Sequence, residues 1–173
     1  MYETGLSKTV VDSATEVLET MCFACVLGLA ESDALPAHDN ISSTVRFAGD
    51  LAGSMSVTVP NPYARSLASS FLGITEAEVS PLITRQFVSE LTNMICGCVL
   101  TGLDSQGAFQ LFAPGMETAS ASSRPNQISP AAAAPGKPAD DRGAGESAGT
   151  HCMRVLDTGD GVIAVGLQLE ADR

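Results

Sequence analysis

The segment from Arg85 to Gly102, with the sequence RQFVSELTNMICGCVLTG, constrains the fold of this chain more than any other. Its apolar residues Phe87, Leu91, Met94 and Cys98 recur at spacings of three and four, which is the pattern of a helix that buries one face. The sequence therefore predicts a long central helix. The rest of the chain has to supply the layer that covers its apolar face.

A polar pair interrupts this apolar helix. Glu90 and Asn93 lie three residues apart, so their side chains project from neighbouring points on one face. Gln86 and Gly97 extend that face in the two directions, which gives a polar stripe ending in a residue without a side chain. Gly97 would allow close approach of a partner, although close helix packing within the domain explains it as well. Spacing alone favours a merely solvated stripe, so a functional interpretation needs support from the rest of the sequence.

Periodic and alternating segments predict the remaining elements, and no internal repeat is evident. We expect an amphipathic helix over Ser7–Leu29, a hairpin from 44–47 and 54–59, a helix with Asn61 as N-cap that runs to Gly73 with Phe71 and Leu72 facing inward, a strand over 108–112 ended by Pro114 and Gly115, and a closing hairpin from 152–156 and 162–167. This order predicts an α+β two-layer domain, with a mostly antiparallel sheet packed against long helices.

The composition changes abruptly between residues 117 and 150. Of these 34 residues, 22 are Ala, Gly, Pro or Ser, and Ile128 is the only large aliphatic residue. Such a segment cannot bury enough apolar surface to offset its ordering entropy, so we expect it to be disordered. Because structured sequence returns after it, residues 1–173 are predicted to form one domain interrupted by an insertion at 117–150.

Charge and hydropathy exclude several classes of partner. Twenty acidic residues against nine basic ones give a net charge of −11, which opposes binding to a phosphate backbone. No window reaches the ~18 uninterrupted apolar residues of a membrane span. The N-terminal sequence MYETGLSK lacks the basic cluster and apolar core of a secretory signal. We expect a cytosolic protein that binds neither nucleic acid nor membranes.

Cysteines and histidines do not indicate a metal or redox site. The cysteines are odd in number, at five, and four lie in apolar sequence predicted to be helical, so buried thiols are favoured over disulfides. Cys96 and Cys98 are two apart on a helix and point to nearly opposite sides, which makes them a poor chelating pair. His38 and His151 have no neighbouring ligand set, and the acidic loop from Asp157 to Gly161 has too few ligands for calcium and is predicted to be a turn.

The run Glu90-Leu-Thr-Asn93-Met-Ile-Cys-Gly97 resembles the ExxN signature of the CheC/CheX/FliY family of chemotaxis phosphatases, and most closely its CheX branch. The order and spacing of the first helix, the hairpin and the Asn61 helix are also similar to CheX, and only the insertion lies outside the resemblance. Gln86 stands where the family signature often has Asp or Ser, and Pro114 is a plausible match to a proline downstream of the asparagine. The first helix carries Glu16 and Glu19 at this offset, so the chain has a single signature.

The resemblance implies a protein phosphatase that dephosphorylates the aspartyl phosphate of a CheY-like response regulator. Asn93 would orient the attacking water, and Glu90 would engage the receiver's lysine or help to position the site. The chain would need no cofactor of its own, because Mg²⁺ would be supplied by the receiver domain. CheX-like proteins also imply a homodimer. A non-catalytic module that docks on a receiver or a flagellar-switch component, and a purely structural dimerisation domain, remain the alternatives.

Overall fold

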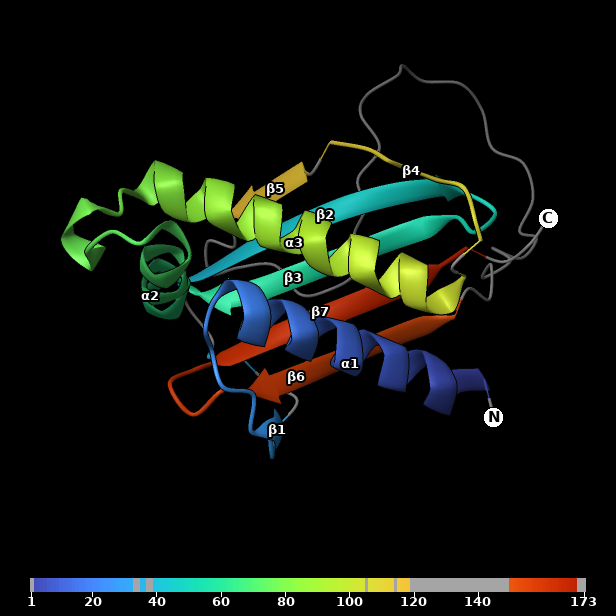
Figure 1. Ribbon diagram of the computed structural model, residues 1–173, viewed down its shortest axis with the longest axis horizontal. Coiled ribbons are helices and arrows are strands. Elements are labelled where there is room, and N and C mark those ends of the chain that lie inside the picture. Colours follow the sequence, from blue (N-terminus) through green and yellow to red (C-terminus); the bar gives the residue numbers. More distant parts are fainter. Residues whose placement is uncertain are drawn as a thin grey trace, which may run out of the picture.

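The computed structural model describes residues 2–32, 35–36, 39–104, 106–113, 115–118 and 150–170 (Figure 1). In these residues the helices are α1 (Tyr2–Met21), α2 (Asn61–Leu72), α3 (Pro81–Leu103) and the short 3-10 helix η1 (Glu76–Glu78). The strands are β1 (Gly28–Leu29), β2 (Asn40–Gly49), β3 (Gly53–Pro60), β4 (Phe109–Leu111), β5 (Gly115–Thr118), β6 (His151–Asp157) and β7 (Val162–Leu169).

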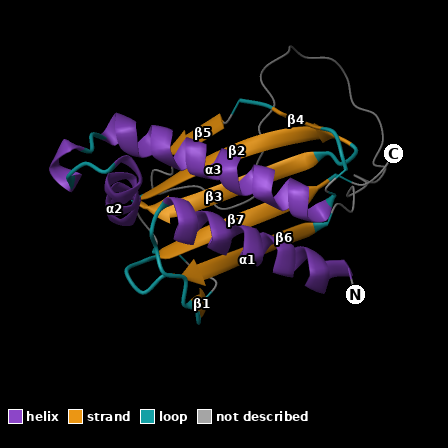
Figure 2. Ribbon diagram, in the orientation of Figure 1, coloured by secondary structure: helices purple, strands orange, loops and turns teal. Residues whose placement is uncertain are grey.

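The seven strands form one antiparallel sheet, and the long helices α1 and α3 lie side by side across one of its faces (Figure 2). The strand order is β1-β6-β7-β3-β2-β4, and β5 also pairs with the outer edge of β2. This arrangement confirms the predicted α+β two-layer fold with a mostly antiparallel sheet.

The sheet is built symmetrically about its centre, because each half consists of a hairpin with short strand pairing at its outer edge. Helix α1 is followed by a short edge strand and the β2–β3 hairpin, and α3 is followed by short edge strands and the β6–β7 hairpin. Each edge strand pairs with the hairpin of the other half, and β3 and β7 meet in the centre. The chain therefore contains a repeat of topology that its sequence does not show.

The core lies between the sheet and the two long helices. Alternation along β2 and β3 turns every second residue toward the helices, and these residues are buried. Fully buried side chains from both layers meet there, among them Leu18, Val45, Met55, Leu91, Ile95 and Ile163. The predicted 54–59 strand and the closing hairpin lie within β3, β6 and β7 as observed.

The first helix is shorter than predicted, because α1 ends at Met21 and not at Leu29. Phe23 adopts the left-handed conformation, and the chain then becomes extended and pairs with β6. The Leu27 N–H donates to the Asp157 carbonyl at 2.8 Å, so the sheet edge supplies hydrogen bonds that a continued helix would not use. Residues 21–30 are all apolar, and a uniformly apolar run gives no periodicity from which to place this boundary.

The start of α2 also differs from the prediction. Pro60 occupies the N-cap position, and Asn61 is the first helical residue. The Asn61 side chain donates to an Asp39 carboxylate oxygen at 3.0 Å, and its backbone N–H donates to the Asp39 carbonyl at 2.7 Å. The helix ends as expected at Gly73 in the left-handed conformation, but Leu72 is exposed although it was predicted to face inward.

The predicted insertion begins inside the sheet. Glu117 and Thr118 belong to β5, which pairs with β2, and β5 begins at Gly115, where the sequence predicted that a strand would end. Residues 119–149 and Pro114 lie outside the described residues, so the disorder expected for the insertion stays a prediction.

None of the described helices is long and apolar enough to cross a membrane.

Candidate active site

Helix α3 begins and ends at residues suited to these positions. Ser80 is its N-cap, and the Ser80 hydroxyl accepts a hydrogen bond from the Ile83 N–H at 3.2 Å. Pro81 follows in the first helical position, where its missing N–H costs nothing. At the other end the Asp104 N–H donates to the Leu100 carbonyl at 2.9 Å. The helix is thus a fixed element 23 residues long.

One face of α3 is buried against the sheet and the other helices. The buried Thr92 hydroxyl meets its need for a hydrogen bond by donating to the Val88 carbonyl at 2.7 Å. Met94 and Cys98, which were predicted for this face, are only partly buried at its margin. The fully buried residues of the face are Thr84, Phe87, Val88, Leu91, Thr92, Ile95, Cys96, Val99 and Leu100.

The opposite face carries the predicted polar stripe. Gln86 and Glu90 are exposed, and Asn93 and Gly97 are half-buried. Within the described part of the chain, neither Glu90 nor Asn93 makes a side-chain hydrogen bond or an ion pair, so the carboxylate and the carboxamide are both free to bind a ligand. The structure therefore places the two predicted site residues together on one accessible face of a rigid helix.

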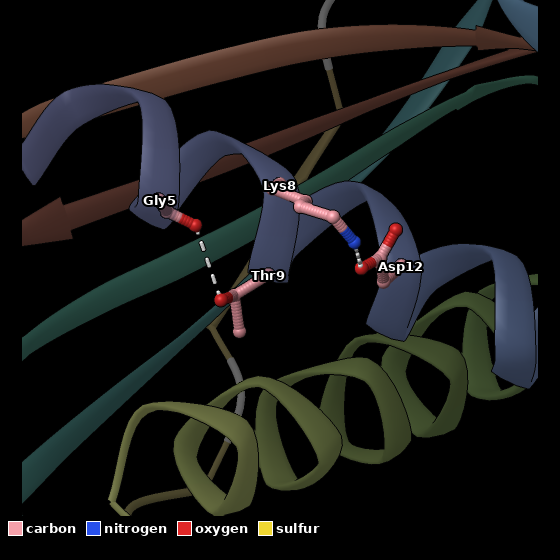
Figure 3. A network of polar contacts seen from close by, with 4 residues as sticks. All are labelled: Gly5, Lys8, Thr9 and Asp12. Carbon is pink, nitrogen blue, oxygen red and sulfur yellow. Dashed lines mark hydrogen bonds and ion pairs between the residues drawn. The ribbon is translucent and has the colours of Figure 1, made fainter. Parts of the chain in front are cut away.

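A groove of about 550 Å³ continues this face between α3 and α1. It is lined by Thr9, Asp12, Ser13, Glu16, Gly97, Cys98, Thr101 and Gly102. Figure 3 shows the α1 side, where Lys8 and Asp12 form an ion pair and the Thr9 side chain is directed toward α3. Gly97 lies one helical turn beyond Asn93, so the groove begins directly beside the polar pair.

The two glycines of this groove differ in their surroundings. A Cβ atom on Gly97 would meet nothing within 4 Å, whereas one on Gly102 would lie 2.9 Å from the Thr9 Cγ2 atom. Close packing between α1 and α3 thus explains Gly102 and does not explain Gly97. Of the two explanations that the sequence left open for Gly97, the structure removes the one based on packing within the domain.

The α1 side of the groove was not anticipated from the sequence. The Cys98 thiol contacts a Glu16 carboxylate oxygen at 3.5 Å, and burial is the largest cause of a raised pKa at Cys98. Glu19 turns the other way, because its carboxylate accepts a hydrogen bond from the Val26 N–H at 3.4 Å. Nothing in the spacing of α1 shows which residues of α3 it contacts, so no sequence signal could have identified these neighbours.

The five cysteines are free thiols, of which Cys22, Cys96 and Cys152 are buried, and the described residues contain no cluster of three His, Cys, Asp or Glu side chains. Burial raises the pKa of the Cys96 thiol to about 12 and that of Cys22 to about 11, so both stay protonated near neutral pH. Cys25 is exposed, although Cys22 three residues earlier is buried. The loop after β6 is a turn, in which the Thr158 N–H donates to the Gly161 carbonyl at 2.9 Å. His151 is an exposed residue of β6, and His38 lies outside the described residues.

Comparison with known proteins supports the resemblance seen in the sequence. The family model of the chemotaxis phosphatase CheX matches residues 41–123, which include both Glu90 and Asn93. No curated protein sequence matches the chain.

Solved structures share the fold. The chemotaxis protein CheX from Desulfovibrio desulfuricans is 20% identical with a TM-score of 0.66, over 95% of this chain and 99% of that chain. CheX in the CheX-CheY-BeF3-Mg complex from Borrelia burgdorferi is 17% identical with a TM-score of 0.62, over 94% and 96%. FliY from Thermotoga maritima is 13% identical with a TM-score of 0.61, over 98% and 90%. The chain is thus similar to the chemotaxis phosphatase CheX over residues 41–123, which carry the signature on α3, and it shares the fold of the solved CheX and FliY structures.

Proposed function

We propose that this chain is a protein phosphatase that hydrolyses the aspartyl phosphate of a CheY-like response regulator in chemotaxis or related two-component signalling. The observation that carries the proposal is the Glu90 and Asn93 pair, which has no partner among the described residues and lies on the accessible face of a helix whose other face is buried. The CheX family model that covers the pair supports it, as does the similar fold of a CheX protein that forms a complex with CheY.

The chemistry asks little of this chain beyond positioning. Phosphoryl transfer is catalysed mainly by orientation and charge stabilisation, without covalent help from the protein. In the proposed mechanism the Asn93 carboxamide enters the receiver's site and orients a water molecule in line with the scissile P–O bond. The Glu90 carboxylate engages a lysine of the receiver and fixes the approach of α3. A helix carries both groups, which favours reproducible insertion.

The magnesium ion belongs to the receiver in this proposal. The described residues of this chain contain no cluster of three His, Cys, Asp or Glu side chains that could hold a metal. The complex from Borrelia burgdorferi contains Mg²⁺ and BeF3 together with CheY. We therefore expect the phosphatase activity to need Mg²⁺ only insofar as the phosphorylated receiver needs it.

The test is the decay of phosphorylated CheY-like receivers from the same genome, with and without this chain. We expect Asn93→Ala to abolish the acceleration while the far-UV circular dichroism spectrum and the melting temperature stay close to those of wild type. Gln110→Ala, which removes an exposed carboxamide from strand β4, is the matched control and should accelerate decay normally. Undiminished phosphate release by Asn93→Ala would show that the active residues have been misassigned.

A non-catalytic docking module is the second candidate function. It is favoured by Gln86, an exposed carboxamide one turn before Glu90, where the family signature often has Asp or Ser. Such a module would bind the phosphorylated receiver, or a flagellar-switch component, without changing the decay rate. Binding with an unchanged decay rate for every receiver would select this function over the phosphatase.

We further propose that the chain is a single cytoplasmic domain that forms a homodimer through a sheet edge. Strand β1 is two residues long and leaves an edge beside the exposed side chains of Leu27 and Leu29. Unpaired sheet edges favour association with another strand. Light scattering after size exclusion should give twice the chain mass, and Leu29→Glu should reduce it to the monomer. A monomeric wild type would contradict the dimer and leave the phosphatase proposal unaffected.

A further inference from the structure

Phe23 combines two unfavourable properties at the end of α1. Its side chain is 79% exposed, although aromatic side chains gain most of their stabilising effect from burial. Its φ angle is +56°, a left-handed conformation that favours glycine and strains a residue with a Cβ atom. The left-handed turn closes the end of α1, where the Ala24 N–H donates to the Leu18 carbonyl, and glycine is the residue most common at such a position. Folding of the chain alone gives no reason for a phenylalanine here.

The backbone around Phe23 is fixed on both sides. The Ala24 N–H donates to the Leu18 carbonyl at 3.1 Å, and the Val26 N–H donates to the Glu19 carboxylate at 3.4 Å. Cys22 is fully buried, and the side chains of Ala24 and Val26 pack against the core. The exposed ring of Phe23 is therefore displayed on an ordered segment, so little conformational entropy is lost when a partner binds it.

The end of α1 lies beside the catalytic pair. Gly102 of α3 approaches Thr9 of α1, and Cys98 of α3 contacts Glu16, so the two helices run antiparallel. Each residue advances about 1.5 Å along a helix, and continuing this register sets the last turn of α1 beside the turn of α3 that bears Asn93. Figure 1 shows the C-terminal end of α1 next to the middle of α3. Phe23 lies two residues beyond this end of α1.

We propose that Phe23 is an aromatic anchor that inserts into an apolar pocket of the receiver domain docked over Glu90 and Asn93. The inference rests on the phosphatase function proposed above and names the contact that secures its substrate. A second copy of this chain is a less suitable occupant, because a subunit covering Phe23 would also cover the neighbouring turn with Asn93. Rigid aromatic side chains at the centre of an interface commonly contribute a large share of the binding energy. Met21, which is also exposed, extends the apolar contact surface.

The test compares Phe23→Gly, Phe23→Ala and Phe23→Tyr by calorimetric titration with a CheY-like receiver loaded with BeF3 and Mg²⁺. We expect the Gly and Ala variants to raise Kd by at least about tenfold, as loss of an interface hot spot does, and the Tyr variant to bind within about threefold of wild type. In the decay assay KM should rise by the same factor, and kcat at saturating receiver should not change. Of the three variants, only Phe23→Gly should raise the melting temperature, because glycine adopts the left-handed conformation without strain.

Met153→Ala is the control for loss of an exposed apolar side chain. Met153 alternates with the buried Cys152 on β6, so it lies on the sheet face away from the helices, and its removal should leave Kd unchanged. Equal Kd values for wild type and Phe23→Ala overturn the anchor, as does a Phe23→Ala variant that loses only its dimeric state. A wild type that binds receivers without accelerating decay overturns the phosphatase function while the Kd comparison still decides the anchor. A wild type that binds no receiver overturns both.

Discussion

Gly97→Ala should make the protein more stable and less active. Glycine in a helix interior costs about 0.8–1 kcal/mol relative to alanine. A Cβ atom at Gly97 meets no other atom within 4 Å, so no steric cost offsets this gain. We therefore expect the free energy of unfolding to rise by about 1 kcal/mol. For a domain of this size that corresponds to a melting temperature about 2–4 °C higher.

Gly102→Ala is the matched substitution in the same helix. Its Cβ atom would lie 2.9 Å from the Thr9 Cγ2 atom. The Thr9 hydroxyl donates to the Gly5 carbonyl at 3.1 Å, so rotating the methyl group away would break a hydrogen bond (Figure 3). Overpacking of this kind costs about 1–3 kcal/mol. Both substitutions gain the helix propensity of alanine, so the two variants should differ in unfolding free energy by the overpacking cost of about 1–3 kcal/mol, with Gly102→Ala the less stable.

Urea titrations followed by circular dichroism at 222 nm measure both effects. In the receiver-decay assay the added methyl group of Gly97→Ala fills the floor of the groove beside Asn93, and we expect a severalfold lower kcat/KM. If Gly97→Ala is as destabilised as Gly102→Ala, the described packing of α1 on α3 is wrong. If it is stabilised but dephosphorylates the receiver at the wild-type rate, the partner does not use the space above Gly97.

Four further predictions follow from other features of the structure. Ser80→Ala should lower the free energy of unfolding by about 1 kcal/mol in a urea titration, because the N-cap bond to the Ile83 N–H is lost; an unchanged value would exclude Ser80 as the cap. Iodoacetamide at pH 8 should label Cys25 in the folded protein and Cys22 and Cys96 only after unfolding, as mass spectrometry can show. Burial raises the folded pKa of the Cys22 and Cys96 thiols to about 11 and about 12, so the stability that they contribute is complete below about pH 9, where the unfolded thiols begin to ionise, and is lost as pH rises further. Replacing residues 119–149 by a linker of about twelve Gly and Ser residues should preserve the fold and the activity. A four-residue linker should prevent folding, since the strand register separates the two flanking positions by roughly 28 Å and each residue spans at most ~3.6 Å; equal melting curves for the two linkers would contradict this register.

The sequence predicted those parts of the fold in which apolar residues alternate with polar ones. The β2–β3 hairpin and the buried face of α3 show this contrast, so their period could be recognised, whereas the β6–β7 hairpin was predicted from two apolar runs on either side of the turn-forming residues 157–161. Helix α1 was predicted too long because residues 21–30 are uniformly apolar, and the boundary depends on hydrogen bonds to β6 far along the chain. Likewise, the Asn61 side chain donates a hydrogen bond to Asp39, a residue just before β2, in place of capping its own helix.

The candidate site could be predicted because it lies within one helix. Glu90 and Asn93 are three residues apart, and local spacing was enough to place them on one face. The groove and the exposed ring of Phe23 depend on how α1 crosses α3, which no local pattern encodes. For Gly97, close approach of a partner and helix packing within the domain could be distinguished only once the atoms around Gly97 and Gly102 were known.

The repeated topology places α1 and α3 at equivalent positions, and of these two helices α3 carries the pair proposed to be catalytic. Helices α1 and α3 begin the two halves of the fold and lie antiparallel on the same face of the sheet. Where α3 offers Glu90 and a free carboxamide, α1 has Glu16 and Glu19. The Glu16 carboxylate contacts Cys98, and that of Glu19 accepts the Val26 N–H and holds the segment after Phe23. A carboxylate cannot donate a hydrogen bond to the attacking water as a carboxamide can. In the proposed function, the half that begins with α3 would supply the chemistry, and the equivalent residues of α1 would fix the surface on which the receiver docks.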